Sequence, residues 1–132
     1  MHTPAPYPAN RPRRLRRDVF TRALVRENQV LTSDLILPVF VLDGQGVTQD
    51  IKSMPGVQRL TLDRLLPVAE ECVRLGIPVM ALFPVLEPSL KTEDGREALN
   101  AKGLVPTVVR ALKDRFPELG VITDIALDPY TT

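Results

Sequence analysis

The sequence predicts an α/β protein built around a parallel sheet, and two observations carry that prediction. Three short apolar runs, at residues 35–42, 78–84 and 121–127, have the length and composition of buried strands. Two segments with apolar residues at helical spacing lie between these runs. Right-handed crossovers then place the three strands side by side as a parallel βαβαβ unit. Strands that are apolar on both sides are typical of sheets covered by helices.

The first strand and the segment after it each contain a proline that constrains the prediction. Pro38 lies within residues 35–42 and removes a hydrogen-bond donor from the strand, so we expect a strand start or a bulge near it. Residues 51–60 predict a small hairpin, because Pro55-Gly56 suits the central pair of a type II turn.

The first helix is predicted to begin at Thr61 or Asp63 and to end at Gly76, which suits the left-handed position after a helix. Its apolar stripe is formed by Leu62, Leu65, Leu66, Ala69, Cys72 and Val73. Cys72 is the only cysteine, so no internal disulfide forms, and its place on this stripe predicts a buried structural thiol.

The second helix is predicted over residues 104–116, with Pro106 in its first turn and Pro117 at its end. Before it comes a long polar loop, residues 85–100. A loop of this length after a strand is typical of a functional or mobile segment.

The N-terminal segment, residues 1–17, is predicted to be a flexible basic arm, followed by a partial barrel domain at residues 18–132. Four prolines disfavour a helix in the arm, and a cluster of arginines disfavours a hydrophobic core. Asp18 is expected to cap a short helix through Glu27. The arm arginines are Arg11, Arg13, Arg14, Arg16 and Arg17.

The charge is unevenly distributed along the chain. Residues 1–26 hold seven arginines against one acidic residue, whereas the remainder holds ten basic residues against fifteen acids. We therefore expect the arm to contact the acidic body of a neighbouring subunit. Nucleic-acid binding and a merely solvated tail are the alternatives. Nucleic acid is disfavoured because Tyr7 is the only aromatic residue of the arm and the body is acidic.

Several classes of function are disfavoured by what the sequence lacks. No apolar run approaches the roughly 18 residues of a membrane span, and no signal-peptide core follows Met1, so we expect a cytoplasmic protein without membrane contact. His2, the only histidine, lies at the terminus and is not expected to bind metal or to form a catalytic relay. Gly44 and Gly46 lack the third glycine of a dinucleotide fingerprint and predict a plain turn.

Two carboxylates, Asp124 and Asp128, mark the candidate site. They lie in and just past the C-terminal end of the predicted third strand, where α/β proteins gather catalytic groups. The alternative is structural, because an aspartate at a strand end, or before Pro129, also favours a turn.

Four segments resemble the porphobilinogen synthases, also called δ-aminolevulinic acid dehydratases, in order and spacing. The loop from Lys91 to Asn100 adds to the likeness, which covers the chain from about Arg14 to Thr132. The segments are LTSDLILPVFV at 31–41, SMPGVQRL at 53–60, GIPVMALFP at 76–84 and TDIALDPYT at 123–131.

The resemblance implies the first three β/α units of a TIM (β/α)₈ barrel, preceded by an extended arm that wraps a neighbouring subunit in a homo-octamer. It also implies condensation of two 5-aminolevulinate molecules to porphobilinogen, with loss of two waters, in haem biosynthesis. Three strands fall short of the ~250 residues of such a barrel, so we expect the chain to be an N-terminal fragment. Mass spectrometry of the native protein would test this.

Enzymes of this family form Schiff bases through two lysines, and the resemblance places both beyond Thr132. None of the four lysines of this chain is expected at a strand end, so no catalytic residue is assigned and the fragment alone is expected to be inactive. These lysines are Lys52, Lys91, Lys102 and Lys113.

The metal implied by the resemblance is magnesium. Zinc-dependent members carry cysteines where this chain has Ala126 and Asp128. Carboxylates suit magnesium better than zinc, so Asp128 is the candidate metal ligand and zinc is not expected. Asp124 matches a position shared by both branches and is assigned to the active-site wall.

Two other functions remain open from the sequence. One is a non-catalytic remnant that associates with full-length subunits through its arm or its open sheet edges. The other is a small α/β binding module that folds on its own as a monomer.

Overall fold

The computed structural model describes residues 5–132, and these residues form two units, one ending at Val30 and one spanning Leu31–Thr132. The predicted division after residue 17, and the flexibility of the arm, stay predictions. In the first unit, a 3₁₀ turn at Arg14–Arg16 precedes the short helix α1, Val19–Leu24.

Helix α1 is shorter than expected, because it ends at Leu24 and not near Glu27. The Thr21 hydroxyl donates to the Asp18 carbonyl at 2.9 Å and so ties its first turn together. The Arg22 guanidinium donates to the carbonyls of Arg16 and Arg17, which joins α1 to the preceding turn. Leu24 remains 84% exposed, so the apolar face of α1 finds little cover within its own unit.

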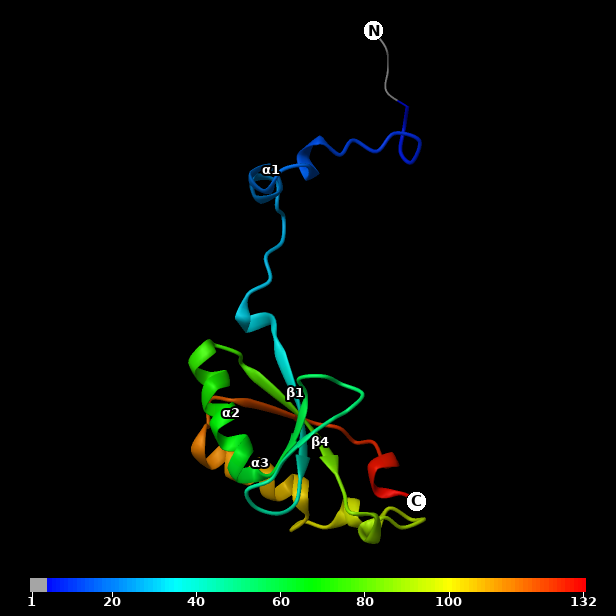
Figure 1. The fold of residues 1–132 in the computed structure, drawn as a ribbon, viewed down its shortest axis with the longest axis vertical. Coiled ribbons are helices and arrows are strands. Elements are labelled where there is room, and N and C mark those ends of the chain that lie inside the picture. Colours follow the sequence, from blue (N-terminus) through cyan, green and yellow to red (C-terminus); the bar gives the residue numbers. More distant parts are fainter. Residues whose placement is uncertain (1–4) are drawn as a thin grey trace. The chain divides into compact units, whose positions relative to one another are not determined.

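The second unit is an α/β structure with a five-stranded sheet in the order β2-β3-β1-β4-β5 (Figure 1). Strands β3, β1, β4 and β5 are parallel, and only β2 runs antiparallel to its neighbour. The strands are β1 Ile36–Leu42, β2 Thr48–Asp50, β3 Gln58–Leu60, β4 Val79–Val85 and β5 Gly120–Thr123. The helices are α2 Leu62–Leu75 and α3 Leu104–Arg115. The predicted α/β class and strand–helix alternation are confirmed.

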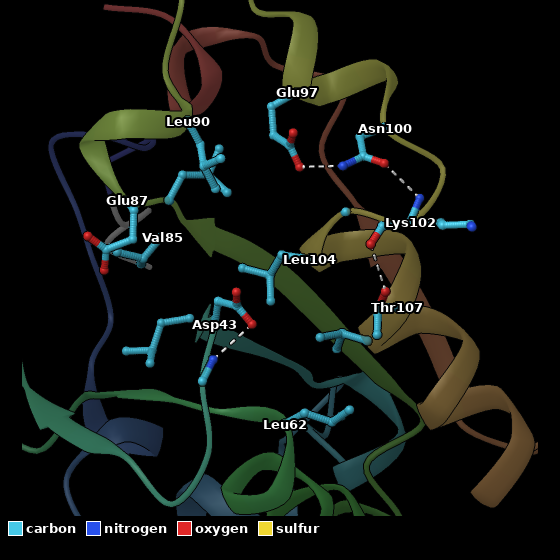
Figure 2. Close-up of a pocket in the computed structure, with 15 residues that line it drawn as sticks. Asp43, Leu62, Val85, Glu87, Leu90, Glu97, Asn100, Lys102, Leu104 and Thr107 are labelled. Carbon is cyan, nitrogen blue, oxygen red and sulfur yellow. Dashed lines mark hydrogen bonds between the residues drawn. The ribbon is translucent and has the colours of Figure 1, made fainter.

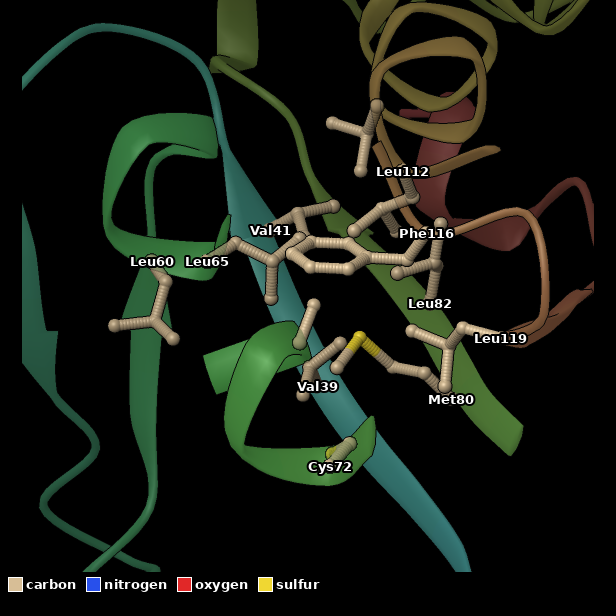
Figure 3. Packing of buried hydrophobic residues seen from close by; sticks show 12 residues of the cluster. Val39, Val41, Leu60, Leu65, Cys72, Met80, Leu82, Leu112, Phe116 and Leu119 are labelled. Atoms are coloured by element: carbon tan, nitrogen blue, oxygen red, sulfur yellow. The ribbon is translucent and has the colours of Figure 1, made fainter. Parts of the chain in front are cut away.

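Alternate residues of the central strands build the core against α2 and α3 (Figure 3). Val39 and Val41 of β1, with Met80 and Leu82 of β4, are buried on the helix side because successive strand residues face opposite sides. The helices complete this core with Leu65, Ala69, Cys72, Val108, Leu112 and Phe116. The predicted apolar stripe of α2 is therefore confirmed, and burial raises the pKa of the Cys72 thiol.

The other face of the sheet is apolar and is not covered by a helix within the described residues. Ile36 of β1 is 51% exposed and Ile122 of β5 is 47% exposed. Helices α2 and α3 share one core on the same side of the sheet, as expected for part of a (β/α)₈ barrel, whose helices form an outer ring. None of the helices in residues 5–132 is both long and apolar enough to span a membrane.

Pro38 does not interrupt β1, contrary to the prediction of a strand start or bulge. The strand runs through it, with Pro38 in register with Ala81 of β4. On its other side β1 pairs with β3 only at Phe40 and Val41, so the strand has one partner at Pro38. A proline is tolerated where one side of the strand needs no hydrogen-bond donor.

The predicted strand at residues 121–127 is wrong in its second half, because β5 ends at Thr123. The pairing of β5 with β4 starts at Val79↔Gly120 and ends at Leu82↔Thr123. No further strand of the described chain lies on the other side of β5. Ile125 is consequently 95% exposed. Strand propensity depends on pairing and on cover, and this segment has neither.

The predicted turns are confirmed. The carbonyl of Met54 accepts from the Val57 N–H at 3.0 Å, and Gly56 has φ +84°, as a type II turn requires. The hairpin begins at Thr48 of β2, three residues before the predicted start at residue 51, and ends with β3 at Leu60 as predicted. Gly76 ends α2 in the left-handed region with φ +75°.

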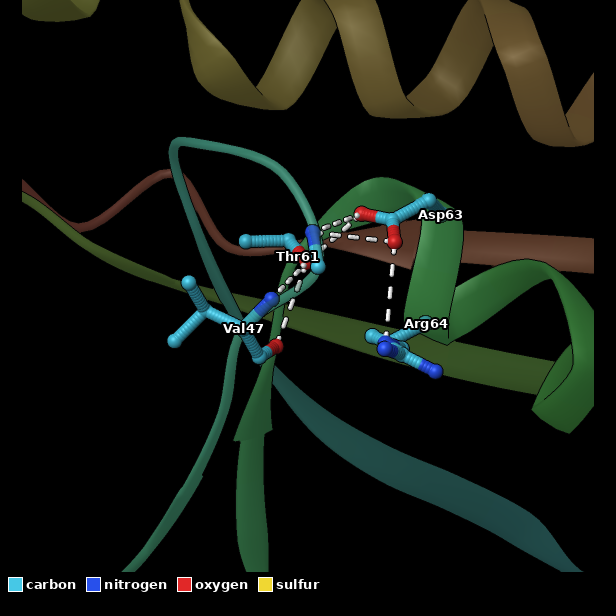
Figure 4. Close-up of polar contacts among 5 residues, drawn as sticks. Val47, Thr61, Asp63 and Arg64 are labelled. Carbon is cyan, nitrogen blue, oxygen red and sulfur yellow. Dashed lines mark hydrogen bonds and ion pairs between the residues drawn. The ribbon is translucent and has the colours of Figure 1, made fainter.

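A network centred on Thr61 fixes the loop that follows β1 (Figure 4). Thr61 is fully buried, and its hydroxyl lies 2.7 Å from Asp63 Oδ1 and accepts from the Val47 N–H at 3.1 Å. The Gly46 N–H donates to the Asp63 carboxylate at 3.0 Å. These hydrogen bonds lower the pKa of Asp63. The Gly44–Gly46 segment is held by them in the turn that was predicted.

Candidate functional site

Asp124 and Asp128 line one cavity at the C-terminal ends of the parallel strands, with a volume of about 280 Å³. Asp124 follows β5 directly, and Asp128 begins a 3₁₀ turn, Asp128–Tyr130. The sequence placed Asp124 inside a strand, whereas the structure places it just beyond one. The remaining lining residues are Phe40, Phe83, Pro84, Ala126, Pro129 and Tyr130.

Aromatic side chains form the wall opposite these carboxylates. Phe40 and Phe83 are direct neighbours across β1 and β4, and their ring centres lie 5.9 Å apart. Both belong to the face of the sheet that the helices leave uncovered. Tyr130 adds a third ring, and its partial burial, together with the Glu97 carboxylate, raises its pKa.

This combination suits a small cation. Carboxylates attract an ammonium group directly, and aromatic faces attract cations through the ring quadrupole. Asp124 Oδ1 also accepts from the Ala126 N–H at 3.3 Å, which is the turn-forming role that the structural alternative predicts. That bond leaves the second oxygen of Asp124 available to a ligand.

The candidate metal ligands in this cavity are carboxylate oxygen atoms. Within residues 5–132 there is no group of three or more His, Cys, Asp and Glu side chains placed to hold a metal ion. Ala126 offers no ligand, and Cys72 is buried on α2 in the core. Magnesium is commonly bound through one or two carboxylates with water completing the shell, and Asp128 offers a carboxylate of that kind.

A second cavity, of about 450 Å³, lies between the ends of β1 and β4 and the first turns of α2 and α3 (Figure 2). Leu62 and Leu104 contribute apolar surface to it. Glu97 accepts from the Asn100 side chain at 2.9 Å, and Asn100 accepts from the Lys102 N–H at 3.0 Å. This cavity is bounded by the loop after β4, which also donates a hydrogen bond from the Thr92 N–H to the Tyr130 carbonyl.

That loop, residues 91–100, is itself ordered by hydrogen bonds. The Thr92 hydroxyl donates to Asp94 Oδ1 at 2.7 Å, and Arg96 Nε donates to the same oxygen at 3.1 Å. These contacts lower the pKa of Asp94 to about 2. The long loop predicted as functional or mobile therefore has defined internal structure.

The four lysines lie where the sequence placed them, away from the strand ends. Lys52 is in the hairpin connection, Lys91 in the loop after β4, and Lys102 just before α3. Lys113 lies on α3, where its Nζ donates to the carbonyls of Pro117 and Leu119.

Sequence reasoning did not single out Phe40, Phe83 or Tyr130 as part of the site. The sequence did contain one indication. Successive strand residues face opposite sides, so Phe40 and Phe83 lie on the face opposite to the buried core residues. Alternation alone does not say which face carries helices, so the signal was insufficient without the fold.

Comparison with protein families identifies a match over residues 9–132 to the family described as delta-aminolevulinic acid dehydratase. A relative of that name from Bradyrhizobium diazoefficiens is 50% identical over 124 residues, which cover 94% of this chain and 35% of the relative. Another, from Rhodobacter capsulatus, is 41% identical over 95% of this chain and 38% of its own length.

A solved structure shows the same relationship. The crystal structure of delta-aminolevulinic acid dehydratase (porphobilinogen synthase) from Toxoplasma gondii ME49, in complex with the reaction product porphobilinogen, matches with a TM-score of 0.84. It is 41% identical and the match covers 93% of this chain and 35% of that chain. The predicted correspondence to the first part of this family's barrel is confirmed, and the chain spans little more than a third of these relatives.

Proposed function

The chain belongs to the delta-aminolevulinic acid dehydratase family, and we propose that the complete protein containing it is a porphobilinogen synthase. This enzyme condenses two 5-aminolevulinate molecules to porphobilinogen with loss of two waters, in haem biosynthesis. The two Schiff-base lysines that the family uses have no counterpart among the residues of this chain, so its own contribution is one wall of the active site.

The observation that carries this proposal is the placement of two carboxylates against aromatic rings at the strand ends. Asp124 and Asp128 share a cavity with Phe40 and Phe83 in a sheet whose C-terminal edge is the usual catalytic edge of such barrels. 5-Aminolevulinate carries an ammonium group, which matches the cavity in charge, and a carboxylate, which does not. The amino end is therefore the part of the substrate that these residues receive.

Asp124 has two roles in this account. It holds the substrate ammonium in place, and it accepts the ammonium proton when the amine must become a nucleophile. The rings of Phe40 and Phe83 add apolar surface to the same cavity, and a ring face attracts a cation through its quadrupole.

Magnesium is the proposed ion, with Asp128 as its ligand in this part of the chain. The all-oxygen donor set supports this choice, since zinc sites favour thiolate and imidazole ligands. When bound, the ion would supply positive charge near the substrate oxygens. Zinc is not proposed.

Assembly and location follow the family. We propose a cytoplasmic homo-octamer in which the arm contacts a neighbouring subunit. In support, all five arm arginines from Arg11 to Arg17 are exposed, and the remainder of the chain is acidic. Nucleic acid and membranes are not proposed as partners.

Substitution of each carboxylate in the complete protein tests this function. Asp128→Asn and Asp124→Asn are expected to lower kcat for porphobilinogen formation by about 100-fold, in line with the loss of a positioned acid–base group. Asp114→Asn is the matched control, because Asp114 is exposed on α3 near its C-terminal end. Equal rates for all three variants would contradict the assigned site.

A further inference from the structure

The segment that carries Asp128 and Tyr130 lies against the loop after β4. The Thr92 N–H donates to the Tyr130 carbonyl at 3.1 Å, across 38 positions of sequence. Within the segment, the Tyr130 N–H donates to the Leu127 carbonyl at 2.8 Å and closes the short turn. The hydrogen bond from Thr92 is thus a long-range tie between the loop and the candidate site.

Gly95 is a second point where the loop lies close to the segment that carries Asp128. It is buried and has φ +60°, a conformation that favours glycine. A β-carbon at this position would lie 3.4 Å from Thr131 Cγ2, 3.7 Å from Tyr130 Cβ and 3.9 Å from Leu127 Cδ2. An added β-carbon would therefore already touch the segment that carries Asp128, and a β-branched side chain would extend further from that contact.

The C-terminal end of the loop turns closely into α3. A β-carbon on Gly103, the residue before α3, would lie 2.9 Å from Glu97 Oε1 and 3.0 Å from the Asn100 carbonyl. On either side of Gly95, the loop is ordered by the hydrogen bonds of Thr92 and Arg96 with Asp94.

We propose that residues 92–100 form a positioning loop that holds Asp128 and Tyr130 in the cavity, with Gly95 as the residue through which the loop acts. The inference rests on the proposed function in one respect, since it takes Asp128 to be a site residue. Gly95 itself does not line the cavity and touches no substrate, so it is a positioning residue.

The test compares two glycines of the complete protein that share a positive φ and differ in their surroundings. Gly95→Val places a branched side chain against Thr131 and Tyr130. Gly56→Val is the matched control, because Gly56 has φ +84° and nothing lies within 4 Å of its added β-carbon. Both variants carry backbone strain, and only the first displaces the site segment.

Two readouts are taken on each variant. Amide hydrogen exchange, measured by mass spectrometry, is expected to quicken in the peptide containing residues 127–131 for Gly95→Val and to stay unchanged there for Gly56→Val. Porphobilinogen formation from 5-aminolevulinate is expected to show a kcat lowered on the order of 10- to 100-fold, with a smaller change in KM, for Gly95→Val alone.

The outcomes distinguish failure of the positioning role from failure of the proposed function. Unchanged exchange at 127–131 in Gly95→Val, or an equal loss of kcat in Gly56→Val, would overturn the positioning role. If the unsubstituted protein forms no porphobilinogen, the proposed function fails while the exchange comparison still decides the role of the loop. Should Gly95→Val not fold, Gly95→Ala and Gly56→Ala are measured instead. Faster exchange at 127–131 in Gly95→Ala than in Gly56→Ala is expected, and equal exchange would overturn the positioning role.

Discussion

At the scale of single residues, Thr61 shows how a buried hydroxyl shapes the edge of the sheet. Its side chain joins the loop after β1 to the first turn of α2 through Val47 and Asp63. Thr61→Val keeps the shape but leaves the Val47 N–H without this partner. We expect it to lower the free energy of unfolding, measured by urea denaturation, by about 1–3 kcal/mol.

The matched control for this substitution is Thr107→Val. Thr107 is exposed on α3, and its hydroxyl donates to the Lys102 carbonyl at the longer distance of 3.3 Å. A surface change of this kind is expected to stay within about 0.5 kcal/mol. Equal losses at the two positions would show that burial of the Thr61 hydroxyl contributes nothing to stability.

The carboxylate of Asp94 is expected to make the stability of the folded chain depend on pH. Its contacts with Thr92 and Arg96 lower its pKa from 3.8 to about 2, so the folded loop favours the carboxylate form. Because the unfolded chain takes up the proton first, the stability from this group is complete above about pH 5 and is lost as pH falls toward 2. The stability difference between wild type and Asp94→Asn should shrink over that range; a difference independent of pH would contradict the assignment.

At the scale of elements, the sequence predicted most of the fold because its helices and central strands carry strong local signals. Gly76 and the apolar stripe from Leu62 to Val73 were sufficient to place α2. The prediction was wrong beyond Thr123, where apolar residues continue without a strand to pair with. Local composition indicates that a segment can form a strand, but only a neighbour makes it one.

The same distinction applies to the elements of the candidate site. The position of Asp124 near the C-terminal edge of the sheet was predictable, since a polar residue that follows a buried strand lies at that edge, and Asp128 lines the same cavity. The contact of Gly95 with Thr131 was not, because 36 positions separate them and the close approach exists only in the folded chain. The aromatic wall required knowledge of which sheet face α2 and α3 cover.

At the scale of the whole molecule, the described chain presents an apolar sheet face and a candidate site at the C-terminal edge of the sheet. Ile36 and Ile122 are half exposed on that face, and Asp124 and Asp128 stand at its edge. In the matched structure of the family, the corresponding region is about a third of the chain. The face and the edge are thus expected to be completed by the remainder of a family barrel.

Porphobilinogen formation is the measurement that tests this account most directly. The complete protein and the 132-residue chain would each be incubated with 5-aminolevulinate and magnesium, and the pyrrole product quantified. We predict product from the complete protein and none from the 132-residue chain, which lacks both Schiff-base lysines. Absence of product from the complete protein, or comparable rates from the two, would contradict the account.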